Sequence, residues 1–341
     1  MVGTGWWATT AHLPALVADE RCRLVGVADL DGERAAATAR RFGVPFACDD
    51  HRALLELGLD GLVVSTPHDA HFEPARDALL AGADVLIEKP MVIDAGQGRE
   101  LVRIARDVGR HLHVGYPYLH TRHARSLARA ITEGRLGQIV LATGLFARGV
   151  LPLYRGDVSG SRHTKPETMW ATSSSTWSDP KRGGGHLYAQ LTHSASLLFF
   201  LTRLRPQIVF AVEDGFGTAV DVLNSITFQT TDGAAGSISG TGTVEPPAPA
   251  VEEYLIFGTR GQATLNTATG TMSFVEYGGA AYAADPLEGN DLFPLYAPAR
   301  RLVDGLVEPR ATDDSADIGL LTVEFLAAAR ESAAGRVAVT L

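Results

Sequence analysis

The chain has 341 residues and is 45% hydrophobic and 20% charged, which is enough apolar material for the cores of two ordinary domains. Its 39 acidic and 30 basic residues give a formal net charge of -9, which disfavours nucleic acid and anionic membrane surfaces as partners. The sequence has no apolar run that predicts a transmembrane helix, and it does not open with the pattern of a signal peptide. Its two cysteines, Cys22 and Cys48, make neither a disulfide framework nor a metal motif. We therefore expect a globular cytoplasmic protein.

Lysine is rare in this chain. Of the 30 basic residues, 27 are Arg and only Lys89, Lys165 and Lys181 are Lys. A GC-rich genome accounts for such a bias without any functional meaning. Arg cannot replace Lys where an amine has to change its protonation state, because guanidinium stays charged. Each remaining Lys is therefore a candidate for proton chemistry.

Up to about Pro117 short apolar runs alternate with amphipathic segments, a pattern typical of βαβ units and a parallel sheet with helices on both faces. The expected strands are Arg23–Ala28, Gly61–Ser65, Val85–Glu88 and His111–Tyr116, and the expected helices are Thr9–Asp19, Gly32–Phe42, Ala70–Ala81 and Asp94–Val108.

Past Arg122 the pattern changes. The segment Arg148–Arg182 is rich in Ser, Thr, Gly, Pro and Trp and has little periodicity, which favours a lid or binding loop over a plain surface insertion. The strand-like runs that follow are separated by tight turns, which predicts an antiparallel sheet. We expect two domains, residues 1–117 and 118–341. The expected helices of the second are Arg122–Glu133, Gly185–Leu201, Pro294–Val307 and Ala316–Ala334, and its expected strands are Gln138–Ala147, Gln207–Val212, Val220–Thr230, Ala234–Thr241, Tyr254–Gly258 and Thr271–Glu276.

The segment Gly3-Thr4-Gly5-Trp6-Trp7-Ala8 fits the dinucleotide fingerprint G-x-G-x-x-G/A. Its first Gly makes the tight turn, its second lets the backbone approach a pyrophosphate, and the helix N-terminus favours phosphate. Asp29 ends the second expected strand about 20 residues later, where a carboxylate binds a ribose 2′-hydroxyl and repels a 2′-phosphate. Arg34 is close enough in sequence to Asp29 to weaken this preference for NAD over NADP. We predict a dinucleotide site that favours NAD, with NADP as the alternative.

Only Met1 and Val2 precede this loop, although the fold calls for a central strand there. Removal of most of that strand would leave backbone groups unpaired, so we expect the true start of the protein to lie upstream.

Glu88-Lys89-Pro90 follows an expected strand, at the edge where open α/β sheets bind ligands. A desolvated Lys89 amine there could exchange a proton with a substrate hydroxyl, whereas a surface Lys at a strand end is the alternative. Thr66 and Pro67 end the preceding strand run. His68 and His71 have a spacing that occurs in metal sites, but without further ligands we expect no metal.

Three glycines, Gly183–Gly185, open the helix of the second half, and Gln190 and His193 lie three residues apart on it. His193 could act as a general acid or base or orient a hydroxyl. A buried histidine with a purely structural role is the alternative.

Together these segments resemble the Gfo/Idh/MocA oxidoreductase family. The resemblance covers almost the whole chain, and the Glu-Lys-Pro motif is its most specific part. It implies a Rossmann domain followed by an α+β domain with a large, mainly antiparallel sheet through which members form dimers or tetramers. It also implies hydride transfer between a nicotinamide and a secondary alcohol or ketone of a sugar, amino sugar or cyclitol. The segments that carry it are Gly3–Ala8, Val25–Arg34, Ser65–His71, Leu80–Met91, Gly134–Gln138, Gly183–His193 and the closing helix through Gly335–Val337.

By this resemblance Lys89 is the catalytic lysine and His193 is the histidine of the D-x-x-x-H motif. The implied cofactor contacts are Gly3, Gly5, Trp6, Trp7, Asp29, Arg34, Ser65, Thr66, His68, His71, Glu88 and Lys89, and the implied substrate contacts are Lys89, Tyr116, Tyr118, Trp177, Gln190 and His193.

The chain also departs from the family pattern. Ala189 replaces the aspartate of D-x-x-x-H, with Gln190 as the adjacent polar residue. The family's Arg and Pro near Leu119 and Arg122 are missing, so the substrate site differs from the common one. Trp170 and Trp177 could stack on a sugar face or simply pack within the loop.

The main interpretation is an NAD(H)-dependent oxidoreductase in which Lys89, assisted by His193, handles the hydroxyl proton of a carbohydrate-like substrate. Transient oxidation that drives elimination or glycoside cleavage is a second interpretation. A cofactor-binding regulator without catalysis is a third, favoured by Ala189 and disfavoured by Lys89 and His193.

Overall fold

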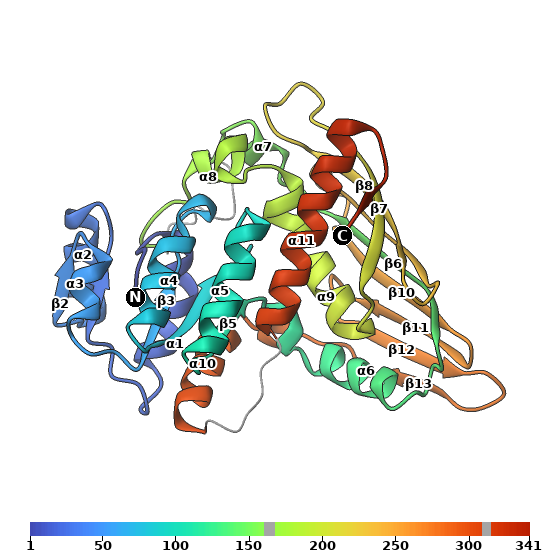
Figure 1. Cartoon of the computed structure of the whole chain (residues 1–341), viewed down its shortest axis with the longest axis horizontal. Coiled ribbons are helices and arrows are strands. Elements are labelled where there is room, and N and C mark those ends of the chain that lie inside the picture. The colour runs from blue at the N-terminus through green and yellow to red at the C-terminus, as the bar shows by residue number, and fades with distance from the viewer. Residues whose placement is uncertain (160–167, 309–314) are drawn as a thin grey trace. The chain divides into compact units, whose positions relative to one another are not determined.

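The structure is a computed structural model that describes residues 1–159, 168–308 and 315–341, so Lys165 and the centre of the expected binding loop lie outside the described residues. The chain divides into two compact units, each built from three stretches of sequence (Figure 1). The first unit contains Met1–Tyr116, Asp157–Thr176 and Leu295–Leu320, and the second contains Pro117–Gly156, Trp177–Pro294 and Leu321–Leu341. The domain limits expected from the sequence stay a prediction.

The sheet of the first unit is parallel throughout. Strand β1 pairs with β2, and β3, β4 and β5 pair in that order. Val2 bridges Ala28 at the end of β1 and Val64 at the end of β3, so it joins the two sets of strands. The elements of this unit are β1 (Gly26–Ala28), β2 (Phe46–Cys48), β3 (Gly61–Val64), β4 (Asp84–Glu88), β5 (Leu112–Gly115), α1 (Leu13–Val17), α2 (Gly32–Phe42), α3 (His51–Leu55), α4 (Phe72–Leu80), α5 (Ala95–Asp107) and α10 (Ala297–Val307).

Backbone hydrogen bonds hold the residues before the glycine-rich loop on both sides. Val2 N donates to Val63 O and Met1 O accepts from Ala28 N, each at 2.8 Å. These two residues therefore occupy the position of the central strand, between β1 and β3. The upstream start expected from the sequence stays a prediction.

Capping residues explain the helix limits of the first unit. Asp31 accepts a hydrogen bond from Arg34 N at the start of α2, and Gly43, with φ of 69°, ends that helix as predicted. Asp94 caps α5 in the same way. The prediction for Thr9–Asp19 was wrong in detail, because a π-helical turn, Ala8–His12, precedes α1. Strand β2 and helix α3 were not predicted because each is too short to show a period.

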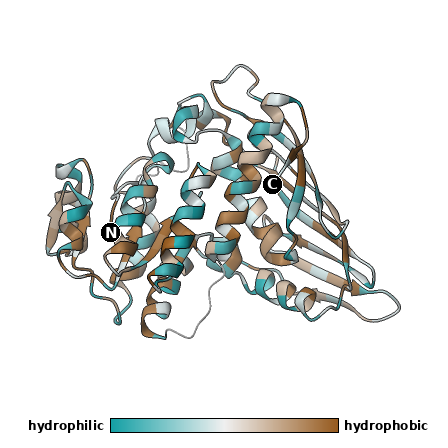
Figure 2. Cartoon of the chain, in the orientation of Figure 1, coloured by the Kyte–Doolittle hydropathy of each residue, from teal (hydrophilic) through white to brown (hydrophobic). Residues whose placement is uncertain are grey.

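The core of the first unit lies on both faces of the sheet. Val85, Leu86 and Ile87 of β4 have no exposed surface, as expected of a parallel strand covered by helices. Helix α5 turns Leu101 and Ile104 inward, and colouring by hydropathy shows the helix with hydrophobic and hydrophilic sides (Figure 2).

The second unit contains a large sheet of order β13-β12-β11-β10-β6-β9-β8-β7-β14. All neighbours in it are antiparallel except β6 and β9, so the expected antiparallel sheet is confirmed with one parallel pair. Its strands are β6 (Ile139–Ala147), β7 (Pro206–Asp214), β8 (Leu223–Thr230), β9 (Ala235–Thr241), β10 (Val251–Gly258), β11 (Gly261–Asn266), β12 (Thr271–Glu276), β13 (Ala281–Ala284) and β14 (Val339–Thr340). The other α-helices within the described residues are α6 (Arg122–Thr132), α7 (Leu151–Tyr154), α8 (Ser174–Ser178), α9 (Thr192–Thr202) and α11 (Ser315–Gly335).

One face of this sheet carries the core of the second unit. Side chains along β8 alternate between buried and exposed, the pattern of a sheet covered on one face. Phe199 of α9, Phe228 of β8 and Phe325 of α11 form a cluster with ring centroids 5.1–6.0 Å apart. Within the described residues, no helix is both long and apolar enough to cross a membrane.

Candidate functional site

The glycine-rich loop lies between the ends of β1 and β3. Gly3 has φ of 81°, and a Cβ there would be 2.5 Å from the carbonyl oxygen of Ser65, so only glycine fits this turn. At Gly5, in contrast, a Cβ would meet no protein atom within 4 Å. Backbone that borders open space beside a helix N-terminus fits the close approach of a pyrophosphate.

Asp29 is tied to the same loop. Its Oδ2 accepts hydrogen bonds from Thr4 N and Thr4 Oγ1, both at 2.9 Å, and its Oδ1 accepts from Asp31 N at 3.1 Å. A carboxylate has about four acceptor positions, so this one retains acceptor capacity for a ribose hydroxyl. The loop and Asp29 are thus fixed together, as the fingerprint requires.

Glu88, at the end of β4, is the centre of a buried polar cluster. Its Oε1 lies 2.8 Å from both Trp7 Nε1 and His12 Nε2, and its Oε2 accepts from the backbone N–H of Lys89 at 3.1 Å. A Cβ at Gly115 would lie 2.5 Å from Oε1, so β5 leaves room for the carboxylate only because residue 115 is glycine. The cluster links the glycine-rich loop to the peptide of the candidate catalytic lysine.

Burial alone would raise the pKa of Glu88, but the hydrogen bond and charge of His12 and the charge of Lys89 hold it below its ordinary value. The group is therefore an anion at neutral pH. An ionised carboxylate only accepts hydrogen bonds, so the Nε2 of His12 carries the proton of this contact.

His71 is fully buried and joins the ends of β3 and β4. Its ring nitrogens lie 2.9 Å from the carbonyl oxygens of Pro90 and Thr66. Burial lowers the pKa of His71, and the two carbonyls oppose that effect only in part. The residue positions the Lys89–Pro90 segment. His68 is buried next to it, with ring centroids 6.1 Å apart.

In the second unit His193 is the second residue of helix α9, which directly follows a π-helical turn, Leu187–Leu191. The prediction of one regular helix over Gly185–Leu201 was therefore wrong in detail. The imidazole of His193 lies among three aromatic rings. The distances between centroids are 5.8 Å to Tyr118, 6.3 Å to Phe146 and 6.5 Å to Phe293. These contacts fix the plane of the ring.

Tyr118 belongs to a buried charged network that the sequence did not reveal. Its hydroxyl donates to Glu252 Oε2 at 2.9 Å, Arg148 contacts both Tyr118 and Glu252, and Thr267 Oγ1 donates to Glu252 at 2.8 Å. Burial, with the charge of Glu252, raises the pKa of Tyr118 well above 10, so the phenol stays protonated. Its hydroxyl is engaged within the protein and its ring packs against His193, while its contact with a substrate stays a prediction.

Three further residues expected to contact the substrate, Tyr116, Gln190 and Trp177, are also buried. Tyr116 follows β5 and is 1% exposed, and Gln190 lies in the π-helical turn. Trp177 packs against Tyr154, with centroids 6.5 Å apart, and its contact with a substrate stays a prediction. Lys89 belongs to the first unit and His193 to the second, so their joint action stays a prediction.

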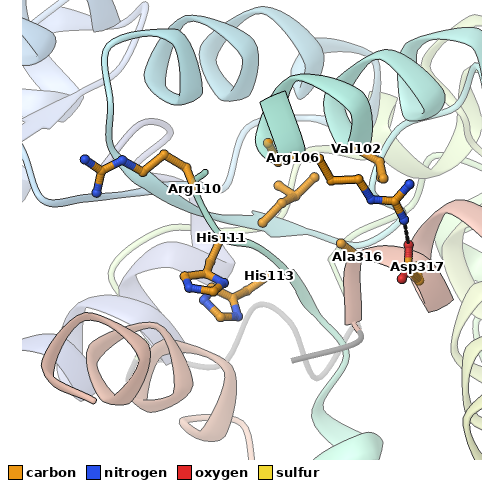
Figure 3. A pocket seen from close by; sticks show the side chains of 9 residues that line it. Val102, Arg106, Arg110, His111, His113, Ala316 and Asp317 are labelled. Atoms are coloured by element: carbon orange, nitrogen blue, oxygen red, sulfur yellow. Dashed lines mark hydrogen bonds and ion pairs between the residues drawn. The ribbon is translucent and has the colours of Figure 1, made fainter. Parts of the chain in front are cut away.

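A cavity of about 140 Å³ opens at the other end of the first sheet (Figure 3). The cavity is lined by His111 and Leu112, where β5 begins, whereas Lys89 follows the end of β4. Within it Arg106 and Asp317 form an ion pair at 2.6 Å. Because β4 and β5 are parallel, this cavity is separate from the glycine-rich loop and Lys89.

A parallel sheet with this loop and a carboxylate after β1 defines a dinucleotide-binding Rossmann domain. The chain belongs to the Gfo/Idh/MocA oxidoreductase family. Residues 1–116 match its model described as "Oxidoreductase family, NAD-binding Rossmann fold", and residues 124–264 match the "GFO/IDH/MocA C-terminal domain". The resemblance, the fold class and NAD as cofactor, all expected from the sequence, are confirmed.

Curated relatives are similar over part of the chain. A D-glucoside 3-dehydrogenase of Escherichia coli is 31% identical over 42% of this chain and 41% of its own length. A dTDP-3,4-didehydro-2,6-dideoxy-alpha-D-glucose 3-reductase of Actinomadura kijaniata is 33% identical over 46% of this chain and 47% of its own length. The matches thus span less than half the length of these relatives.

Solved structures share the fold over the whole chain. GenD2 from gentamicin A biosynthesis, in complex with NAD, has a TM-score of 0.78 and 22% identity, covering 100% of this chain and 95% of its own. At that identity the likeness establishes the fold alone.

Proposed function

We propose that the protein is an NAD-dependent oxidoreductase that transfers a hydride between the nicotinamide and a secondary alcohol or ketone of a sugar, amino sugar or cyclitol. The observation that carries the proposal is the linkage of Lys89, through Glu88, to Trp7 of the glycine-rich loop. The names of the relatives, a glucoside 3-dehydrogenase and a hexose 3-reductase, support the substrate class.

The bound NAD supplies the hydride acceptor, and the residues of the chain supply position and proton transfer. Lys89 takes the hydroxyl proton at Nζ during oxidation and returns it during reduction. Glu88 holds the Lys89 peptide, and Asp29 accepts a hydrogen bond from the ribose. His193, held by its aromatic neighbours, is the second proton-handling group.

The test compares Lys89→Met with Lys181→Met, a substitution of an exposed lysine in the other unit. NADH binding is followed by fluorescence titration, and turnover by the absorbance of NADH with a panel of sugars and cyclitols. We expect Lys89→Met to lose turnover and keep NADH affinity, and Lys181→Met to keep both. Turnover by Lys89→Met would contradict the role of Lys89 in proton transfer. Absence of NADH binding by the wild-type protein would contradict the proposed cofactor site.

We also propose a cytoplasmic homodimer or homotetramer. The outer face of β7 exposes Ile208, Phe210 and Val212 by 39–52%, an apolar surface that a second copy would cover. Cys22 and Cys48 are both free thiols, which fits a reducing compartment. Light scattering on the wild type and on Phe210→Glu tests the assembly, with a smaller particle expected for the variant.

A further inference from the structure

A segment from the middle of the sequence, Asp157–Thr176, belongs to the nucleotide-binding unit. Its described part carries Trp170, which lies against α2. The indole Nε1 donates to Thr38 Oγ1 at 3.2 Å, and the Arg34 guanidinium lies 5.7 Å from the centroid of the indole ring. Thr38 is fully buried and Trp170 is half-buried, so this contact is part of the folded unit rather than a chance surface encounter.

Arg34 occupies a sensitive position for a dinucleotide. It is the third residue of α2, and its backbone N–H is bound by the cap Asp31 at 3.0 Å. Asp31 N in turn donates to Asp29, the carboxylate expected to bind the ribose. Arg34 is therefore the cation closest along the chain to Asp29, and an arginine in this region of a Rossmann fold is what accommodates the 2′-phosphate of NADP.

The side chain of Arg34 is held on two sides. One guanidinium nitrogen lies 3.7 Å from Asp31 Oδ2, and the indole of Trp170 covers a face of the group. A cation over an aromatic face loses that attraction when it moves away. An Arg34 that turned to meet a 2′-phosphate would have to leave one or both partners.

We propose that Trp170 is a specificity-determining residue of the cofactor site, which restrains Arg34 and so disfavours NADPH relative to NADH. The inference rests on the proposed function, since it concerns the same nucleotide site. It gives Trp170 a role toward the cofactor, in place of the stacking on a sugar face considered from the sequence.

The test measures the dissociation constants of NADH and NADPH by fluorescence titration and needs no substrate. We expect Trp170→Ala to bind NADPH more tightly. The dissociation constant of NADPH divided by that of NADH should then fall by about two- to fivefold, which corresponds to the free energy of one exposed cation–π contact. Trp170→Phe keeps an aromatic face and should retain most of the preference. Thr38→Val, which removes only the hydrogen bond to the indole, should produce a smaller shift in the same direction.

The double variant Arg34→Ala/Trp170→Ala supplies the decisive comparison. If Trp170 acts through Arg34, its removal changes the ratio in the wild type and leaves it unchanged when Arg34 is absent. An unchanged ratio in Trp170→Ala, or the same change in both backgrounds, would overturn the inference while NADH binding still supported the proposed function. A wild-type protein that binds neither nucleotide would overturn both.

Discussion

Trp7 and His12 share one hydrogen-bond acceptor, the Oε1 of Glu88, and each lies 2.8 Å from it. In a regular α-helix residues five apart point in directions that differ by about 140°. Here the helix begins with a π-helical turn in which Leu13 N donates to Ala8 O, and this wider turn lets both side chains reach the same oxygen. The first helix, the glycine-rich loop and the end of β4 are thus fixed to one carboxylate.

The first prediction concerns this shared acceptor. His12→Phe leaves the buried carboxylate of Glu88 without one of its two side-chain donors, and we expect the free energy of unfolding to fall by about 2–4 kcal/mol. His12→Gln keeps an N–H donor and should cost less. Chemical denaturation of the wild type and both variants at neutral pH measures the difference.

Adding Glu88→Gln to His12→Phe completes a double-mutant cycle. Because the amide carries no charge, the loss of His12 should cost less in the Glu88→Gln background, with a coupling of about 1–3 kcal/mol. Additive effects of the two substitutions would show that the contact does not stabilise the protein.

His12 shows why sequence reasoning found only part of the site. Lys89 stood out because Lys is rare and because it follows a strand, and Asp29 because of its spacing from the loop. His12 gave no such signal. A helix with 3.6 residues per turn would place Trp7 and His12 on different faces, and the π-helical turn that brings them together is not visible in the sequence pattern. Arg148 and Glu252 were missed because 104 residues separate them in the chain.

The fold was more predictable than the site. Amphipathic periodicity located α2, α5 and α6, since helices of 11–13 residues complete several turns. Strand β2 has three residues and shows no alternation at all. The described part of Asp157–Thr176 meets the first unit in a tertiary contact, that of Trp170 with Thr38, which no local pattern encodes.

The second prediction separates two glycines of the same loop. Gly5→Ala places a methyl group where the structure has no protein atom, so the free energy of unfolding should change by less than about 1 kcal/mol. The methyl would occupy the space that a pyrophosphate needs, and we expect NADH binding to weaken by at least about tenfold, or about 1.4 kcal/mol. Fluorescence titration and thermal unfolding measure the two effects.

Gly3→Ala is the matched control. Its methyl would lie 2.5 Å from Ser65 O at a positive φ, so the fold itself should lose at least about 2 kcal/mol. Full NADH affinity in Gly5→Ala would contradict the placement of the pyrophosphate beside this loop.

The third prediction comes from His186, a fully buried residue of the second unit. Its Nδ1 lies 3.1 Å from the Tyr154 hydroxyl and its Nε2 lies 3.1 Å from the carbonyl oxygen of Phe146. The neutral ring with its proton on Nε2 satisfies both contacts, since it donates to the carbonyl and accepts from the hydroxyl. Burial lowers the pKa of His186 from 6.5 to about 4.

Because its pKa is lower in the folded protein, His186 binds a proton first in the unfolded chain, so acid favours unfolding. The free energy of unfolding should therefore fall as the pH drops from 6.5 toward 4, with about 2 kcal/mol lost to this residue between pH 7 and pH 5. His186→Gln offers an amide donor and acceptor but does not titrate, so denaturation at both pH values should show a weaker pH dependence in the variant. An equal loss in both proteins would mean that His186 is already charged in the native state, in conflict with the hydrogen bond to Phe146 and the burial of its ring.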